Sequence, residues 1–208
     1  MPQNSRLSIG SWHDLMKCFS WDENDATYHV LIKAYSEKHR AYHTLDHIEA
    51  CFRHLDKVYD QAKHPHEIEL ALWFHDAVYK PFSSRNEEDS AYMARAFLVQ
   101  NQTRADIIER ICDLIILTKE HNLPSSIDGK LMLDIDLSIL GASERVYAQF
   151  EKDVRREYKR IPSFVFKKKR KEILQTFIAR SKIYQTDYFF ARFEKQAKKN
   201  LSWAIGNL

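Results

Sequence analysis

Glycine and proline, the residues that most often interrupt regular structure, are scarce in this chain, with four Gly and five Pro among 208 residues. A β-sandwich or barrel of this length needs many more turn residues than that. The shortage excludes a many-stranded β-fold and predicts long helices with short connections. We therefore expect an all-α fold, built as one multi-helix bundle.

Cysteines and long apolar runs are also few. Cys18, Cys51 and Cys112 are odd in number and far apart, which argues against a disulfide framework and against a zinc knuckle. No segment approaches the roughly 18 apolar residues of a membrane-spanning helix, and the N-terminus lacks the apolar core of a signal peptide. We expect a cytoplasmic protein with reduced thiols and no membrane partner.

Charge of either sign shows no large excess, since the net charge is +3 and the isoelectric point is about 8.6. This balance is unlike that of a dedicated nucleic-acid binder and is compatible with a phosphorylated small-molecule substrate. The densest basic run is Lys167–Lys171. On a helix such a run spreads around the axis, and no aromatic residues are interleaved for stacking on bases, so a solvated face is favoured over a nucleic-acid site.

Hydrophobic residues make up 44% of the chain and recur at helical spacing almost without interruption. We expect a single domain, 1–208, with a site-bearing core at about 40–160 and C-terminal helices, 162–205, packed on it. One helix is predicted over 65–79, opened by Pro65. Asn86 is the expected N-cap of the next helix, and Gly141 the expected glycine just past the end of a later one.

Side chains that bind metals occur in three separated segments. His43 and His47 lie four residues apart where a helix begins after Thr44, so both imidazoles can address one site. His75 falls in the apolar stripe of the 65–79 helix, with Asp76 beside it. A buried imidazole and carboxylate need partners. Either a divalent cation or a direct His–Asp hydrogen bond satisfies that need.

The third segment carries Asp134 and Asp136 inside an otherwise apolar helix. The two residues are two apart and point in different directions, so one ion is not expected to bind both. One interpretation gives Asp134 a structural capping or pairing role while Asp136 alone faces a site. The other places both carboxylates on a solvated face.

In this order the residues resemble the HD superfamily of metal-dependent phosphohydrolases, an all-helical family that binds a divalent metal through a His, a His-Asp doublet and a distant Asp. The segment YHTLDH is similar to YHNxxH of the cyclic-nucleotide phosphodiesterases in that superfamily, and DLSIL to their segment around the final Asp. The resemblance implies His43 as the general acid and four metal ligands: His47, His75, Asp76 and Asp136. An alignment with HD nucleotidases makes His43 the ligand instead of His47.

Further motifs resemble a bacterial branch of predicted HD phosphohydrolases over roughly residues 40–160. They are NEEDSA (86–91), Thr118 with His121, DLSILG (136–141) and VRREY (154–158). The chain departs from other classes. A phosphodiesterase-like domain with its purine-clamping glutamine cannot be located, and Lys80-Pro81 stands where guanosine-tetraphosphate hydrolases have Glu-Asp.

The predicted function is hydrolysis of a phosphate ester or anhydride of a nucleotide-like molecule, with Mn²⁺, Mg²⁺, Fe²⁺ or Co²⁺ as cofactor. The alternative is a non-catalytic metal-binding module with a regulatory role. Homo-oligomerisation is left open by the sequence.

Four further residues are candidates around such a site. Glu87 orients the attacking water or a second ion, or else only complements a helix dipole. Arg40, Arg155 and His121 are candidate substrate contacts. For Arg155 an ion pair with Glu151 or Glu157 is the alternative, and for His121 a surface loop position.

Overall fold

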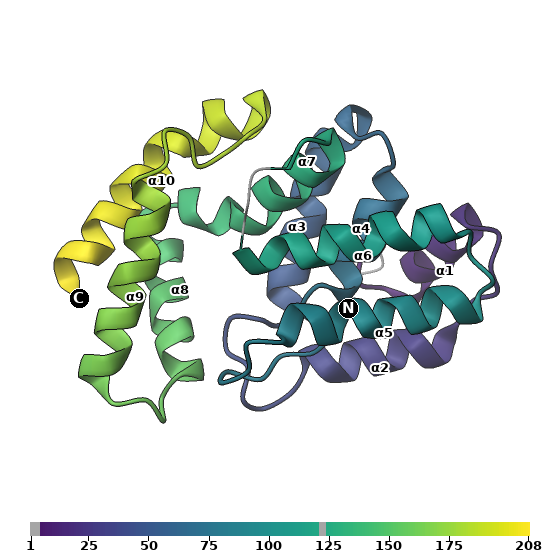
Figure 1. Ribbon diagram of the computed structural model, residues 1–208, viewed down its shortest axis with the longest axis horizontal. Coiled ribbons are helices and arrows are strands. Elements are labelled where there is room, and N and C mark those ends of the chain that lie inside the picture. Colours follow the sequence, from purple (N-terminus) through teal and green to yellow (C-terminus); the bar gives the residue numbers. More distant parts are fainter. Residues whose placement is uncertain (1–4, 121–123) are drawn as a thin grey trace. The chain divides into compact units, whose positions relative to one another are not determined.

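Helices provide all the regular secondary structure of the residues that the computed structural model describes, 5–120 and 124–208. The elements, in chain order, are α1 (Ile9–Cys18), α2 (Asp25–Tyr35), α3 (Leu45–Val58), the 3₁₀ turn η1 (Tyr59–Gln61), α4 (Pro65–Phe74), α5 (Asn86–Gln100), α6 (Ala105–Glu120), α7 (Ile127–Asp136), the 3₁₀ turn η2 (Leu137–Gly141), α8 (Glu144–Glu157), α9 (Ser163–Ile178) and α10 (Asp187–Asn207) (Figure 1). The predicted all-α class is confirmed.

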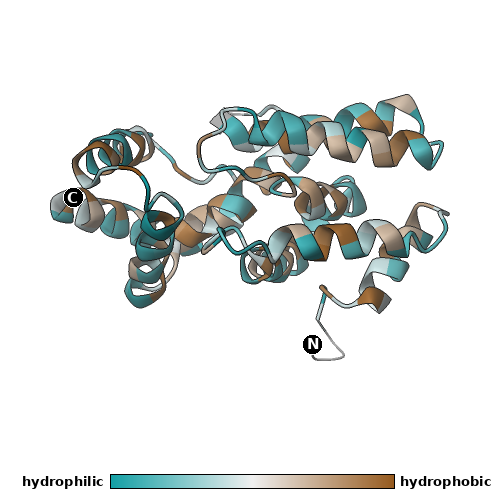
Figure 2. Ribbon diagram, turned by 90° about the horizontal axis from the view of Figure 1, so that it is seen from below, coloured by the Kyte–Doolittle hydropathy of each residue, from teal (hydrophilic) through white to brown (hydrophobic). Residues whose placement is uncertain are grey.

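The contacts between Cα atoms divide the chain into two compact units, 1–132 and 133–208. Hydrophilic and hydrophobic residues mix along the helices of both (Figure 2), as expected for helices that bury one face. The single domain and the docking of the C-terminal helices stay predictions.

Within the residues described, no helix combines the length and the apolarity needed to cross a bilayer.

The first unit is organised around α4. Every side chain from Glu67 to Phe74 is buried, and the helix contacts α1, α3, α5 and α6. Trp73 of α4 lies against Trp12 of α1, with their ring centroids 5.4 Å apart and their planes nearly perpendicular. Such edge-to-face pairs add to the free energy gained by burial. A helix buried on all sides gives a rigid support for whatever follows its C-terminal end.

Charged side chains on α4 are tolerated because each has a partner. Glu67 binds Arg110 through two hydrogen bonds of 2.7 and 2.8 Å, and Glu69 binds Arg6 at 2.8 Å. The start of the helix is fixed from α7, where the Asp128 carboxylate accepts the backbone N–H of Lys63 at 2.7 Å. These bonds set the direction of α4 and therefore the position of the doublet at its end.

In the second unit, η2 packs against α8 and α10. Asn200 of α10 donates to the carbonyl oxygens of Leu140 and Ala142, both at 2.8 Å. Gly141 lies inside η2 and does not have a positive φ, so the prediction that it stands just past the end of a helix is wrong. Its role is steric, because an added Cβ would lie 2.6 Å from Phe193 Cβ.

Candidate metal centre

The His75–Asp76 doublet lies in a turn directly after α4, which ends at Phe74. The prediction of a helix to Tyr79 is therefore wrong. Arg40 supports the backbone of this turn. Its Nη1 donates to the carbonyl oxygen of Asp76 at 2.7 Å and its Nη2 to that of Ala77 at 3.0 Å. A buried carbonyl group needs a partner, and here a guanidinium from another segment replaces the next helical N–H.

Two hydroxyl groups complete this turn. Tyr35 Oη accepts the backbone N–H of Asp76 at 3.2 Å and donates to the carbonyl oxygen of Trp73 at 3.1 Å. Ser90 Oγ accepts the backbone N–H of Val78 at 3.1 Å. The doublet is thus presented by a turn whose backbone is bonded to side chains of α2 and α5.

Asn86 holds the connection that follows. Its amide binds the backbone of Lys80 in both directions, accepting at Oδ1 and donating from Nδ2, each at 3.0 Å. The expected N-cap role is wrong, because Arg85 is the N-cap of α5 and makes no side-chain capping bond. The NEEDSA segment therefore supplies two residues, Asn86 and Ser90, that fix the backbone after the doublet.

His47 reaches the doublet from α3. The helix begins at Leu45 after Thr44 in the N-cap position, so His47 is its third residue, as expected. Its side chain is only 4% exposed, and its ring contacts that of Tyr42 at a centroid distance of 4.8 Å. Because His47 lies in the first turn of α3, the helix backbone and not a loop fixes the position of its side chain.

Three potential ligand atoms converge in the first unit. His47 Nε2 and His75 Nε2 are 3.2 Å apart, and Asp76 Oδ2 lies 3.1 Å from His75 Nε2 and 3.7 Å from His47 Nε2. Ligands bound at about 2.1 Å in octahedral or tetrahedral geometry lie about 3.0 to 3.4 Å from one another. The two distances from His75 Nε2 lie in this range and the one between His47 and Asp76 is slightly longer, so the donors are close to the spacing that a single divalent cation requires, and both histidines are buried.

The hydrogen bonding of His75 also fits such a role. His75 Nδ1 lies 2.9 Å from the carbonyl oxygen of Leu72, which can only accept. In the neutral ring the proton is therefore on Nδ1, and Nε2 directs its lone pair toward His47 and Asp76. Histidine ligands of metals are typically oriented by a bond of this kind.

The electrostatics favour an ionised Asp76. Burial alone raises the pKa of this carboxyl. When the imidazoles of His75 and His43 are protonated and no cation is bound, their charges and the hydrogen bond that His75 then donates outweigh burial and hold the pKa well below its usual range. The ionised carboxylate is the form that binds a cation.

His43 stands beside this cluster, in the bend before α3. Its ring stacks on that of Tyr79 at 4.2 Å, and the centroids of His43 and His47 are 6.2 Å apart. Arg40 Nη1, which binds Asp76 O, also donates to the carbonyl oxygen of His43 at 3.2 Å. The guanidinium of Arg40 therefore holds the backbone carbonyl groups of both His43 and Asp76 in place.

Glu87 occupies the first turn of α5. Burial raises the pKa of its carboxyl, and the negative charges of Asp76 and Glu88 add to that effect. The negative charge of Asp76 therefore disfavours ionisation of Glu87. Both interpretations of Glu87, a catalytic one and a helix-dipole one, stay predictions.

The remaining candidates differ in their surroundings. Arg40 is fully buried and binds backbone carbonyl groups, so the structure gives it a positioning role, and contact with substrate stays a prediction. Arg155 binds the carbonyl oxygens of Tyr158 and Ile161 at 2.6 and 3.0 Å. Glu151, one of its expected partners, binds Arg170 instead. His121 lies outside the described residues.

Asp134 and Asp136 lie at the end of α7. Asp134 is buried and accepts hydrogen bonds from Thr186 N and Oγ1, both at 2.7 Å, and from Gln185 N at 2.8 Å, just before α10. Burial raises its pKa to about 6 in spite of these bonds. The structural interpretation of Asp134 is confirmed. Asp136, the last residue of α7, is half-buried, and its role as a ligand stays a prediction.

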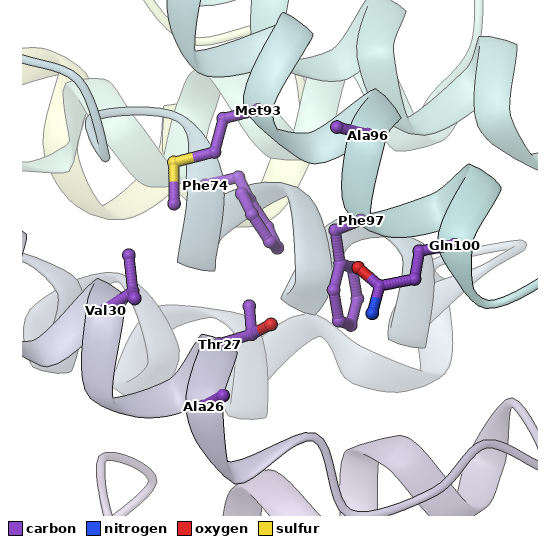
Figure 3. Close-up of a pocket in the computed structure, with 8 residues that line it drawn as sticks. All are labelled: Ala26, Thr27, Val30, Phe74, Met93, Ala96, Phe97 and Gln100. Carbon is purple, nitrogen blue, oxygen red and sulfur yellow. The ribbon is translucent and has the colours of Figure 1, made fainter.

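A separate groove of about 280 Å³ opens between α2 and α5. Figure 3 shows the rings of Phe74 and Phe97 flanked by Val30 and Thr27 on one side and by Met93 on the other. Its lining includes no titratable side chain, so acid–base chemistry is not expected there.

Sequence reasoning missed the residues that support the cluster. Tyr35 belongs to no motif, yet its hydroxyl is bonded to the turn. Tyr79 is predicted only as the end of a helix, yet its ring stacks on that of His43 at a centroid distance of 4.2 Å and also contacts that of His39 at 6.2 Å. The NEEDSA motif was the one signal that pointed to Asn86 and Ser90.

No protein-family model matches this chain, and the comparisons with curated proteins and with solved structures give no match either.

Proposed function

We propose that this protein is a metal-dependent phosphohydrolase acting on a phosphate ester or anhydride of a nucleotide-like small molecule. The observation that carries the proposal is the convergence of His47 Nε2, His75 Nε2 and Asp76 Oδ2 at ligand spacing. Two imidazoles with a carboxylate suit Mn²⁺, Fe²⁺ or Co²⁺, and Mg²⁺ less well. Asp136 is proposed as a further ligand on the strength of the DLSILG motif.

The bound cation supplies the chemistry common to such enzymes: it polarises a phosphoryl oxygen and lowers the pKa of water. Around it, His43 is proposed to protonate the leaving oxygen, supported by its place beside the cluster and its stacking on Tyr79. Glu87 is proposed to orient the attacking water. For Arg40 the hydrogen bonds to backbone carbonyl groups support a positioning role, and contact with substrate stays a prediction.

The test is a panel of phosphomonoester, pyrophosphate and phosphodiester substrates, assayed with each metal. Asp76→Ala is expected to lose activity by about a thousandfold or more and to bind metal weakly. The matched control is Asp113→Ala, which removes an exposed carboxylate of α6 and is expected to be neutral. Activity that survives Asp76→Ala would refute the mechanism.

A second variant and a metal-binding measurement distinguish the hydrolase from the non-catalytic, regulatory module. His43→Gln is expected to reduce turnover while leaving the affinity for metal unchanged, since it is proposed as an acid and not as a ligand. Stoichiometric metal binding without hydrolysis of any substrate in the panel would favour a non-catalytic module. Absence of metal binding would overturn both.

A further inference from the structure

Positive charge is concentrated in the second unit. Residues 1–132 contain 15 Lys and Arg against 20 Asp and Glu, a net charge of −5, whereas residues 133–208 contain 17 against 9, a net charge of +8. Nine of these cations lie in the segment 155–171, which we call the basic tip, and its one acidic residue, Glu157, is buried. The modest net charge of the whole chain conceals this patch.

The basic tip is an ordered structure formed by the end of α8, the start of α9 and their connection (Figure 1). Arg155 binds the carbonyl oxygens of Tyr158 and Ile161 and lies over the ring of Phe166, 4.8 Å from its centroid. Arg170 is joined to Glu151 of α8 by two bonds of 2.8 and 2.9 Å. These contacts fix the tip to the rest of its unit.

Three lysines of the tip form one stripe. Lys167, Lys168 and Lys171 follow Phe164 by three, four and seven residues, the spacing that places side chains on one face of a helix. All three are exposed, and within the described part of the chain none has a carboxylate within ion-pair distance, in contrast to Lys169 and Arg170. Their charges are available to a partner.

An apolar pair stands at the end of that stripe. Phe164 is 77% exposed and Val165 is 37% exposed, at the first turn of α9. An exposed aromatic and an aliphatic residue next to lysines are the combination found on helices that lie at a lipid–water interface, where the apolar groups enter the acyl boundary and the cations meet headgroups.

We propose that the basic tip binds the surface of an anionic lipid bilayer. Binding of this kind to a bilayer surface needs no membrane-spanning helix. Two features of the stripe favour lipid over nucleic acid. Val165 beside it cannot stack on a base, and its three cations are lysines, point charges suited to diffuse headgroups, whereas the exposed Arg156 and Arg160 of the tip lie outside the stripe. The proposal does not depend on the hydrolase activity.

The experiment is co-sedimentation of the intact protein with vesicles of phosphatidylcholine alone and with vesicles that also contain phosphatidylserine. Binding is expected only to the anionic vesicles and is expected to weaken with salt. Replacing Lys167, Lys168 and Lys171 by Gln should lower the binding constant about a hundredfold, because each cation near the surface contributes about fivefold. Phe164→Ser should lower it about tenfold.

Matched controls exist in the same unit. Changing the exposed Lys152, Lys195 and Lys199 to Gln removes the same charge outside the tip, and Trp203→Ser removes an aromatic residue that is 50% exposed. Both controls are expected to bind vesicles as the natural protein does. Equal losses in control and tip variants, equal binding to both vesicle types, or tight RNA binding in a gel shift with no vesicle binding would each overturn the proposal.

Discussion

Arg40 is the residue on which both parts of the candidate centre depend. Its guanidinium binds the carbonyl oxygens of His43, Asp76 and Ala77, and it lies near the rings of Tyr35 and Tyr79. The planar group holds its donors in a fixed fork that spans separated carbonyl groups in set directions, and the compact ammonium group of lysine does not reproduce that geometry.

Arg40→Lys is therefore expected to lower the free energy of unfolding by about 2 to 4 kcal/mol, because buried carbonyl groups lose their donors. It is also expected to weaken metal binding by displacing Asp76. Denaturant unfolding and metal titration measure the two effects. Arg85→Lys, at a residue whose side chain is 75% exposed, is the control and should change neither.

The carboxyl group of Glu69 is expected to make the stability of the folded protein depend on pH. Burial raises the pKa of its carboxyl, and the nearby Arg6 only partly offsets this. Between the ordinary value and the raised one, the folded protein binds more protons than the unfolded chain, so this group's contribution to stability falls as the pH rises through that interval.

Glu69→Gln is expected to remove that component, so the difference in unfolding free energy between variant and natural protein should change with pH above about 4.5. Urea unfolding across pH 4 to 7 measures it. A difference that stays constant over that range would contradict the assignment. Glu172→Gln, at an exposed carboxylate, is the control.

Gly141 is required because Phe193 packs directly against its Cα. A Cβ at this position would lie 2.6 Å from Phe193 Cβ and 2.8 Å from the backbone oxygen of Phe193. Gly141→Ala is expected to cost about 1 to 3 kcal/mol, because η2 or α10 must shift. Gly206→Ala, where a Cβ meets nothing within 4 Å, should be neutral or slightly stabilising. Thermal unfolding of the two variants measures both effects, and an unchanged melting temperature for Gly141→Ala would contradict the role assigned to this glycine.

At the scale of elements, the turn after α4 shows how side chains from separate helices can replace helical hydrogen bonds. Tyr35 Oη serves the backbone at Trp73 and Asp76 together. Tyr35→Phe leaves both groups without that partner and is expected to lower the unfolding free energy by about 1 to 3 kcal/mol. Tyr92→Phe, on a side chain that is 75% exposed, should have no effect. An unchanged melting temperature for Tyr35→Phe would show that the turn does not need the hydroxyl.

This turn also marks the limit of prediction from sequence. Periodicity located α4, and the start of α3 at Thr44 followed from local residue types. The end of α4 could not be predicted, because the side chains that bond to the turn after it, Tyr35, Arg40 and Ser90, come from other segments of the chain. Likewise Asn86 and Gly141 have the residue types of caps, yet their partners, Lys80 and Phe193, are known only from the fold.

At the scale of the molecule, the sequence predicted the helical class from the shortage of glycine and proline. The need of buried polar side chains for partners predicted only that His75 and Asp76 would be paired or bound to a cation, and the grouping of His47 with them came from the resemblance to the HD superfamily. The sequence did not predict the division of charge between the two units, since the net charge of a chain sums over regions of opposite sign.

That division has a consequence for the behaviour of the protein in solution. The acidic first unit of one molecule attracts the basic tip of another when the Debye length is long, about 30 Å at 0.01 M salt. In 0.15 M salt the Debye length falls to about 8 Å and the attraction is screened. We expect a negative second virial coefficient in light scattering at low ionic strength that turns positive on adding salt. Neutralising Lys167, Lys168 and Lys171 should weaken the attraction, so that the protein becomes more soluble as its net charge approaches zero.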